Sequence, residues 1–340
     1  MKDLGWNIEP VSNLAKFSED WNRLNSVHGG FILLDHLFFS EAVSHLAENP
    51  LQLAICYQGE HVVCITIVEK VRFGISRTFQ PSQSPSGAWI QDPTIPTQLL
   101  IKSLAKKLHW WPLGFSITQQ DPKLECLNLT QSQECNTLPY IETGSLQSTE
   151  NFDTFWESRG KNLRQNTNKA VNRLNKESGT LLLKVITDPD DIDEAIEQYG
   201  KLESSGWKSG TNTAITPDND QGRFYKSLFR KLAHNKQTII FQLFLGDTII
   251  ASDLTVLSNQ SIIILKTTYD ENYKRFSPAT VLRKFQFEKI FNDPQISQIE
   301  FYGKMMDWHY RWTNDTREMF HLNWLSKTGK AIKSIREKIK

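Results

Sequence analysis

The chain has 340 residues, which corresponds to about two domains of ordinary size. Its 39 Lys and Arg residues nearly balance 38 Asp and Glu residues, so the formal net charge is +1. This balance argues against a protein that coats nucleic acid through a general excess of positive charge. A hydrophobic fraction of 39% and an aromatic fraction of 11% are sufficient for globular cores and exclude a disordered chain.

The sequence contains no signal for a membrane span, a secretory leader or a metal site. No apolar run approaches the roughly 20 residues that cross a bilayer, and residues 1–7 lack the apolar core of a signal peptide. None of the four cysteines forms a CxxC pair, so they predict reduced, buried thiols in a cytoplasmic protein rather than a zinc site or a disulfide framework. They are Cys56, Cys64, Cys126 and Cys135.

In the first half, helical stretches surround a β-hairpin whose turn is Gln58-Gly59-Glu60. A loop rich in Pro, Ser and Gly follows over residues 78–87. The predicted helices cover residues 14–24, 31–47 and 97–108, and the predicted strands cover 51–57, 61–68, 115–118 and 126–129.

The second half repeats this plan, with a second hairpin around Gly246-Asp247 and a second loop that contains Ser-Pro. We therefore expect tandem copies of one module, with domains at 1–145 and 146–340 and a boundary in the polar stretch 142–150. The predicted helices cover 152–176, 190–202, 221–233 and 278–291, and the predicted strands cover 238–245, 248–257, 262–269 and 298–302.

One strand–loop–helix unit in the second half is a candidate anion site. The strand 262–269 leads through a short polar loop to Ser277, a suitable helix N-cap, and Pro278, which fits the first helical position. The free amides and the dipole of such a helix attract anions, and Lys274 and Arg275 add positive charge. The alternative is an ordinary capped helix after a strand.

The run from Tyr269 to Ala279, Tyr-Asp-Glu-Asn-Tyr-Lys-Arg-Phe-Ser-Pro-Ala, resembles the acyl-CoA loop of GNAT-like acyltransferases. The resemblance is to the branch found with cellulose and exopolysaccharide biosynthesis loci, which is similar in fold to the Fem-type peptidoglycan aminoacyl transferases. Further matching stretches are residues 79–85, 159–166, 202–208 and 299–304.

This resemblance implies an α/β (α+β) protein with tandem GNAT-like domains, each a twisted mixed sheet flanked by helices. It implies acetyl-CoA or another acyl-CoA as donor, with the pantetheine between strands 262–269 and 298–302. The usual Gly-rich loop is replaced here by Lys-Arg-Phe-Ser-Pro-Ala at 274–279. The implied donor-binding residues are Lys266, Thr268, Tyr269, Lys274, Arg275, Phe276, Ser277, Ala279 and Thr280.

Acyl transfer requires a base for the nucleophile and an acid for the leaving thiolate. Glu203 ends a helical stretch before the loop that lines the acceptor site in GNAT folds, so it is a candidate base. Trp207, in the same loop as Lys208, could stack on a sugar. The alternatives are a solvated glutamate and a core tryptophan.

Further polar side chains interrupt apolar strands or lie in aromatic segments. Asp253 and Lys266 occupy strands expected to be neighbours, and their pair would be either structural or functional. Glu300 and Tyr302 alternate on one strand and so should share a face; Tyr302 or Tyr269 could protonate the thiolate. His309, beside Trp308, is a second candidate base or a structural histidine.

Two segments are locally basic. The helix around Arg159 to Lys176 could contact CoA phosphates or an anionic acceptor, or simply be solvated. Residues 327–340 form an amphipathic helix that could touch an anionic membrane at its inner face or dock on its own domain.

The sequence therefore favours a cytoplasmic acyl-CoA-dependent N- or O-acyltransferase that acts on a sugar-linked precursor of envelope polysaccharide or exopolysaccharide. Two alternatives remain open. One is Fem-type transfer from aminoacyl-tRNA, and the other is a degenerate GNAT pair that binds a ligand or partner without catalysis.

Overall fold

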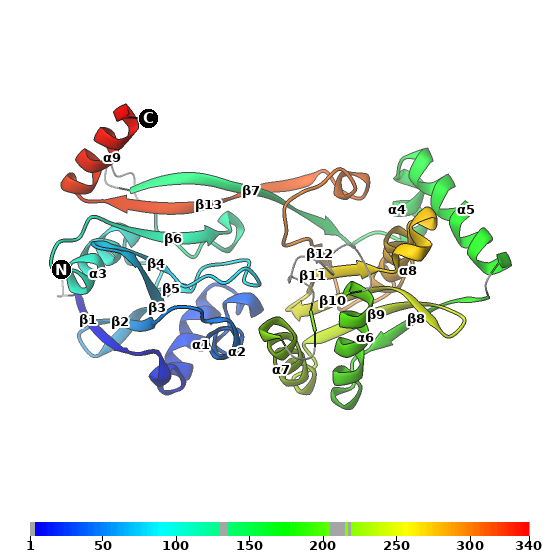
Figure 1. Cartoon of the computed structure of the whole chain (residues 1–340), viewed down its shortest axis with the longest axis horizontal. Coiled ribbons are helices and arrows are strands. Elements are labelled where there is room, and N and C mark those ends of the chain that lie inside the picture. The colour runs from blue at the N-terminus through cyan, green and yellow to red at the C-terminus, as the bar shows by residue number, and fades with distance from the viewer. Residues whose placement is uncertain (1–3, 130–134, 178, 205–214, 217–218, 340) are drawn as a thin grey trace. The chain divides into compact units, whose positions relative to one another are not determined.

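The computed structural model describes residues 4–129, 135–177, 179–204, 215–216 and 219–339 (Figure 1). The chain forms two compact units, each of which has its own core. Unit 1 comprises Met1–Glu142 and Arg317–Lys340, and unit 2 comprises Thr143–Thr316.

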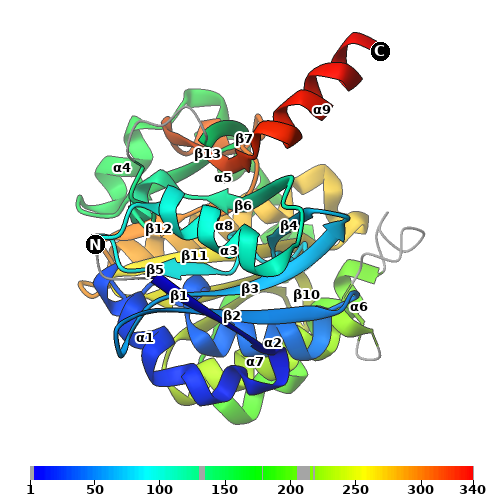
Figure 2. The same ribbon diagram turned by 90° about the vertical axis from the view of Figure 1, so that its left-hand side faces the viewer.

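Unit 1 is built on a mixed sheet with helices on both faces. Helices α1 and α2 cover one face and α3 covers the other (Figure 2). The strands follow the order β1-β2-β3-β4-β6-β13, and the short β5 pairs with β3. The strands are β1 (Leu4–Pro10), β2 (Leu51–Gln58), β3 (His61–Arg72), β4 (Ile75–Thr78), β5 (Trp89–Gln91), β6 (Gly114–Gln120) and β13 (Asp315–Leu325), and the helices are α1 (Ser18–Val27), α2 (His36–Leu46) and α3 (Thr97–Leu108).

Unit 2 has the same construction, with strand order β7-β12-β11-β10-β9-β8. Helices α6 and α7 pack on one face of the sheet, and α8, with α4 and α5 against it, packs on the other (Figure 1). The strands are β7 (Cys135–Gln147), which belongs to unit 2 from Thr143 onward, β8 (Leu181–Ile186), β9 (Thr238–Leu245), β10 (Thr248–Ser258), β11 (Ser261–Tyr269) and β12 (Gln298–Glu300). The helices are α4 (Phe152–Ser158), α5 (Lys161–Glu177), α6 (Ile192–Ser204), α7 (Asp220–His234) and α8 (Pro278–Phe291).

Both units follow one chain order: a strand, two helices, three antiparallel strands, a helix and a strand parallel to the last of the three. The parallel pairs are β4 with β6 and β11 with β12. This internal repeat confirms the predicted α/β fold class of two similar modules, each a mixed sheet flanked by helices.

The strand at one edge of each unit's sheet, β13 in unit 1 and β7 in unit 2, comes from a part of the chain that the sequence alone assigns differently. Strand β7 follows β6 but pairs with β12 in unit 2, and β13 follows β12 but pairs with β6 in unit 1. Residues 317–340 therefore belong to unit 1, whereas a simple division at 145/146 assigns them to the second domain. Residues 142–147, expected to be a polar linker, are part of strand β7.

The local predictions were accurate where the hydrophobic period was clear. The helices at 97–108 and 278–291 have the predicted bounds, and both hairpins are present. The expected strand at 126–129 is wrong, because those residues form no regular structure. The expected helix 152–176 is interrupted at Arg159 and Gly160, where the chain passes from α4 to α5.

All four cysteines are free thiols, three of them buried. Burial raises the pKa of Cys56 and of Cys126 to about 12, so these thiols stay protonated. Within the ranges that the structure describes, no helix has the length and apolar character required to cross a bilayer.

Because β13 pairs with β6, a core mutation in β13 should destabilise unit 1. Leu322 is buried in the core of unit 1 with Trp324 and residues of α3. Leu322→Ala should lower the free energy of unfolding of unit 1 by about 2–5 kcal/mol, because it leaves a cavity. Hydrogen exchange should accelerate in β4 and β6 and stay unchanged in β9 and β10.

Ile335→Ala is the matched control, since Ile335 is exposed in α9 (Lys327–Ile339) at the same end of the chain. Faster exchange in β9 and β10 than in β6 of Leu322→Ala would contradict the assignment of β13 to unit 1.

Candidate functional site

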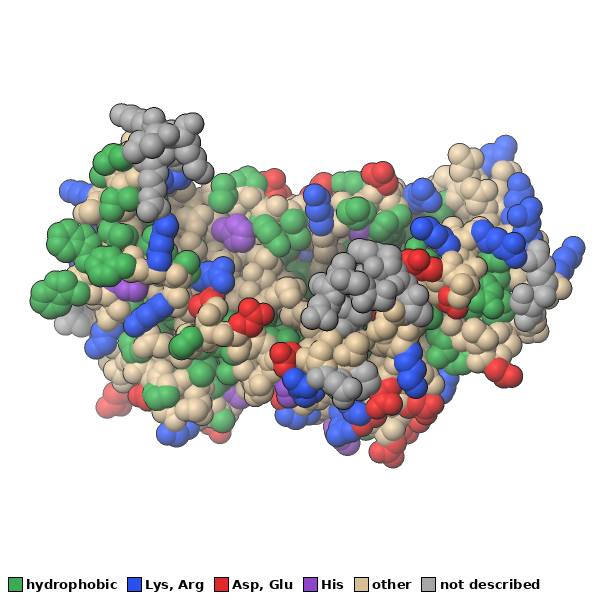
Figure 3. Space-filling model, in the orientation of Figure 1, with side chains coloured by type: hydrophobic (Ala, Val, Ile, Leu, Met, Phe, Trp, Pro, Cys, Tyr) green, Lys and Arg blue, Asp and Glu red, His purple; other side chains and the backbone are tan. Residues whose placement is uncertain are grey.

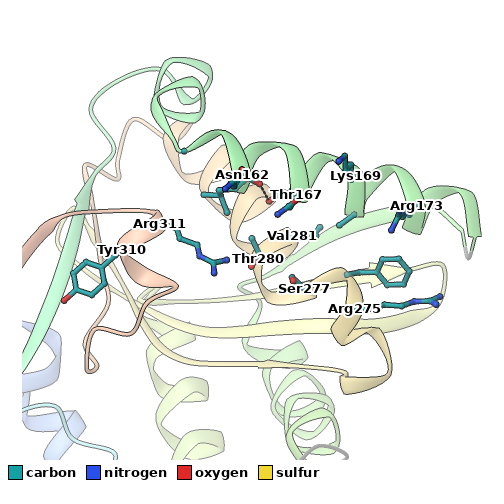
Figure 4. Close-up of a pocket in the computed structure, with 15 residues that line it drawn as sticks. Asn162, Thr167, Lys169, Arg173, Arg275, Ser277, Thr280, Val281, Tyr310 and Arg311 are labelled. Carbon is teal, nitrogen blue, oxygen red and sulfur yellow. Dashed lines mark hydrogen bonds between the residues drawn. The ribbon is translucent and has the colours of Figure 1, made fainter.

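A cavity of about 670 Å³ lies within unit 2, between α5, the start of α8 and the short helix η7 (His309–Arg311) (Figure 4). Its lining combines three segments that are far apart in the sequence. The lining residues are Gly160, Asn162, Leu163, Asn166, Thr167, Lys169, Ala170, Arg173, Arg275, Phe276, Ser277, Thr280, Val281, Tyr310 and Arg311.

The start of α8 forms one wall of this cavity. A short 3-10 helix, η6 (Glu271–Phe276), ends at Ser277, which adopts φ 51° and ψ 58°. Pro278 then occupies the first turn of α8. Ser277 occupies the predicted N-cap position of α8, but its side chain makes no capping hydrogen bond. The left-handed turn, which favours glycine, is made here by serine.

The cavity is strongly positive. Lys169 and Arg173 come from α5, Arg275 from η6 and Arg311 from η7, and no Asp or Glu is among the described lining residues. Figure 4 shows Arg311 directed from η7 toward Thr280 and Ser277, and Arg173 and Arg275 on opposite walls. The first-turn amides of α8 and its dipole add to this positive potential. The arrangement suits an anion with several charges.

The basic helix predicted around Arg159 to Lys176 divides into two parts. Lys169 and Arg173 line the cavity, whereas Lys161 and Lys176 are exposed and do not. Arg159 donates to the carbonyl oxygen of Trp312 and lies 4.5 Å from the centroid of the Phe155 ring. It therefore fixes the position of η7 relative to α4 and α5.

The implied donor-binding residues fall into two groups. Arg275, Phe276, Ser277 and Thr280 line the cavity. The others do not: Lys274 and Ala279 flank the same turn, and Lys266, Thr268 and Tyr269 lie on β11.

The pairing between strands β11 and β12 is short. Their parallel pairing covers Ser261–Ile263 and Gln298–Glu300, after which β12 ends while β11 continues to Tyr269. Tyr302 was expected on this strand with Glu300, but β12 ends before it. Glu300 is buried at the end of β12, and Tyr302 is half-buried beyond it.

A buried ion pair attaches α8 to the sheet. The guanidinium of Arg283 donates to the Asp253 carboxylate on β10, to Gln286 Oε1 at 2.7 Å and to Thr267 Oγ1 at 2.9 Å. Asp253 is 0% exposed and Arg283 is 1% exposed. Burial raises the pKa of Asp253 while the charge of Arg283 opposes the rise.

The expected Asp253–Lys266 pair is wrong. The register places Asp253 opposite Thr267, and Lys266 opposite Leu254. Because successive side chains alternate between the faces of a strand, Asp253 faces α8 and Lys266 faces α6 and α7. No sequence pattern indicated that Arg283 is the partner of Asp253, because Arg283 lies among apolar residues on the second turn of α8.

Lys266 instead contacts Glu203, the candidate base. Its ammonium lies 3.8 Å from Glu203 Oε1 and 5.5 Å from the centroid of the Tyr225 ring. Glu203 is 2% exposed, and its Oε2 accepts a hydrogen bond of 2.8 Å from the backbone N–H of Ile215. The carboxylate is therefore held in a defined position between α6, α7 and β11, and the solvated alternative is excluded.

His309 lies on the α8 side of the sheet, against Trp308 and Phe301, with ring centroids 3.5 Å and 5.2 Å away. Its Nδ1 accepts a hydrogen bond from the backbone N–H of Met306 at 2.9 Å. Burial, followed by the charge of Arg283, lowers the pKa of His309 to about 4. A neutral ring whose Nδ1 is already bonded is a weak base, so the geometry favours the structural alternative.

Several residues of the site were not predicted from the sequence. The cavity is also lined by Asn162, Asn166 and Arg311. The stretches that contain them are recognisable in the sequence as family-like or aromatic, but no sequence pattern singled out these residues. Trp207 and Lys208 lie outside the described residues. Within the described ranges, no group of three or more His, Cys, Asp or Glu side chains could hold a metal ion.

Comparison with known proteins identifies a known domain in unit 2. Residues 161–310 match the family model of the acetyltransferase (GNAT) domain. This range contains strands β11 and β12 and every lining residue of the cavity except Gly160 and Arg311. Comparison with curated protein sequences gives no match.

Solved structures of low sequence identity have a similar fold. The carboxyl-terminal domain of a putative lysylphosphatidylglycerol synthetase from Agrobacterium fabrum is 10% identical, with a TM-score of 0.57 over 93% of this chain and 94% of that one. FemX is 9% identical, with a TM-score of 0.55 over 92% and 96% of the two chains. The L-PGS from Bacillus licheniformis is 14% identical, with a TM-score of 0.55 over 94% and 93%. The chain thus has a GNAT-type fold, and residues 161–310 in its second unit match the GNAT domain.

Proposed function

We propose that the protein is an acyl-CoA-dependent N- or O-acyltransferase that binds the phosphates of its donor in the α5–α8 cavity. The observation that carries this proposal is the set of four cations, with no acid beside them among the described lining residues, around the start of the helix that follows β11. Acetyl-CoA is the simplest donor of this class.

The residues of the cavity fit the charges of CoA. Its pyrophosphate and its 3′-phosphate are separate anionic groups. The cavity has cations on α5, on η6 and, through Arg311, on η7, so that more than one phosphate can be contacted. Guanidinium groups bind phosphate oxygens bidentately, while the α8 amides bind them at the helix end. The absence of glycines from this loop is compatible with binding, because Ser277 supplies the left-handed turn.

The parting of β11 and β12 supplies a path for the rest of the donor. An extended chain can hydrogen-bond to the edge of β11 beyond Ile263, where β12 no longer covers it. We expect such a path to run from the positive cavity toward the interior of unit 2. The thioester would then reach the region between Glu203 and the end of β12.

In the proposed reaction, the acceptor amine or hydroxyl forms a bond to the thioester carbonyl carbon and the carbon–sulfur bond breaks. Glu203 is the proposed base that takes the proton from the acceptor, and Tyr302 or Tyr269 returns a proton to the thiolate. Lys266, 3.8 Å from Glu203 Oε1, helps to hold the carboxylate in place. Asp253 serves this reaction by fixing Arg283 and α8, and His309 supports Trp308.

The proposed acceptor is a sugar-linked precursor of envelope polysaccharide or exopolysaccharide, used in the cytoplasm, where acyl-CoA is available. This part of the proposal is supported by the family resemblance of the sequence. Trp308, 38% exposed, provides an aromatic surface for a sugar ring. Trp207, Lys208 and Glu300 remain the other proposed acceptor contacts.

A second candidate is Fem-type transfer from aminoacyl-tRNA. The basic character of α5 continues beyond the cavity at Lys161 and Lys176, which are exposed. A polynucleotide backbone could use these outer cations, whereas one CoA molecule would not require them. The two candidates therefore differ in which lysines of α5 affect binding.

Calorimetric titration with acetyl-CoA tests the proposal. Lys169→Gln should weaken acetyl-CoA binding by about tenfold or more, because it removes a charged contact to phosphate. Lys176→Gln, on the same helix but outside the cavity, is the matched control and should bind like wild type. Ser277→Glu should abolish binding, while Ser277→Asn, which tolerates the left-handed turn, should retain it.

Absence of binding by wild type at millimolar acetyl-CoA would contradict the proposal. If aminoacyl-tRNA then binds and Lys176→Gln weakens it as much as Lys169→Gln, the second candidate is correct. If neither ligand binds, the non-catalytic alternative is favoured.

A further inference from the structure

Two neighbouring loops of unit 1 carry large apolar side chains into solvent. The first is the tip of the β3–β4 hairpin, and the second connects α3 to β6. The exposed fractions are 51% for Val71, 78% for Phe73, 100% for Trp110 and 55% for Trp111. Side chains with so little contact inside the molecule contribute almost nothing to its core, and exposed aromatics of this size mark interaction surfaces.

The two loops form one surface because their backbones are in contact. The backbone N–H groups of Leu113 and Gly114 both donate to the carbonyl oxygen of Gly74, at 2.7 and 3.1 Å. Gly74 has φ 69°, and a Cβ built on it would lie 2.6 Å from the carbonyl oxygen of Trp111. The hairpin tip and the Trp110–Trp111 loop are therefore held side by side.

The start of α9 borders the same loop. A Cβ built on Gly329 would lie 2.1 Å from the carbonyl oxygen of Leu113, and the N–H of Ser326 donates to that oxygen at 3.1 Å. This contact docks α9 on unit 1. Ile332 and Ile335 on α9 are 38% and 58% exposed.

The surface is positive as well as apolar. The sequences 70–74, 105–113 and 327–335 contain no Asp or Glu. Their exposed cations include Lys70, Arg72, Lys106, Lys107 and Lys333. Figure 3 shows hydrophobic side chains interspersed with Lys and Arg side chains over the part of unit 1 near α9. We call the surface formed by these three segments the aromatic–basic face.

We propose that the aromatic–basic face binds the surface of an anionic lipid bilayer, with the two tryptophans and Phe73 inserted among the headgroups. Indole rings favour the boundary between water and hydrocarbon because they are apolar with one polar N–H. The surrounding lysines and arginines complement anionic headgroups. Projecting side chains suit a deformable lipid surface, whereas a protein partner of fixed shape would require pockets to receive them.

This inference does not depend on the proposed acyl transfer. The face lies in unit 1, and the candidate cavity lies in unit 2. Membrane binding would bring the protein to a membrane-associated acceptor, but it can be measured with no donor or acceptor present. A failure of acetyl-CoA binding and a failure of lipid binding are therefore separate results.

The test is co-sedimentation of the full chain with vesicles of equal parts phosphatidylglycerol and phosphatidylethanolamine, compared with phosphatidylcholine vesicles. Wild type should sediment with the anionic vesicles and release at high salt. Trp110→Ser should weaken binding by about tenfold or more, through lost apolar burial. Lys106→Gln and Lys107→Gln should each weaken it by about fivefold.

The matched controls are Leu182→Ser and Lys184→Gln, at exposed positions of β8 in unit 2, and neither should change vesicle binding. Trp110→Ser should unfold at the wild-type temperature, because the side chain is fully exposed. Wild type that stays in the supernatant, or a Trp110→Ser variant that sediments like wild type, would overturn the proposal. A wild-type dimer that becomes monomeric in Trp110→Ser, without vesicle binding, would show instead that the face joins two copies of this chain.

Discussion

The buried pair between Arg283 and Asp253 determines where the start of α8 lies. Arg283 is on the second turn of α8, and its guanidinium contacts β10 through Asp253 and β11 through Thr267. Removal of one member would leave an uncompensated charge in the interior, which costs several kcal/mol. The pair therefore fixes the first turn of α8 above the end of β11, and with it the wall of the cavity that carries Ser277 and Thr280.

The segments around the start of α8 are positioned by contacts with the same buried group. The aromatic rings of Phe287, Phe301 and Trp308 surround the Arg283 guanidinium at 5.7–5.8 Å, so the segment after β12 is packed on the same group. That segment leads to η7, and Arg159 ties η7 to α4 by its bond to Trp312. Three segments from distant parts of the sequence thus meet at one cavity, and each contributes at least one cation to it.

The sequence predicted the fold where local signals were strong. The helix at 278–291 begins at Pro278 as expected because its start is fixed by the Ser-Pro pair, and the hairpins follow from clear β patterns and Gly-containing turns. Strands β7 and β13 were missed because they carry few consecutive apolar residues, and their partners lie in the other half of the sequence. A local sequence pattern cannot show that a strand pairs with a distant part of the chain.

The sequence could predict which segments contribute to the site, but not which of their side chains lie together. The family-like stretches 159–166 and 269–279 both contribute lining residues, yet only the folded chain shows that Lys169, Arg275 and Arg311 surround one space. The pairing of Asp253 was predicted incorrectly because strand register decides it, and a bulge between Leu254 and Thr255 shifts that register. Glu203 could be chosen from its place at a helix end, whereas its contact with Lys266 could not.

The central claim is that the start of α8 and the facing part of α5 hold the phosphates of the donor. Hydrogen–deuterium exchange with saturating CoA tests it most directly, since bound phosphate would shield the first-turn amides of α8. The account predicts slower exchange in residues 277–284 and 162–173 and unchanged exchange in β4 and β6 of unit 1. Unchanged exchange at the start of α8, with protection in unit 1 instead, would contradict it.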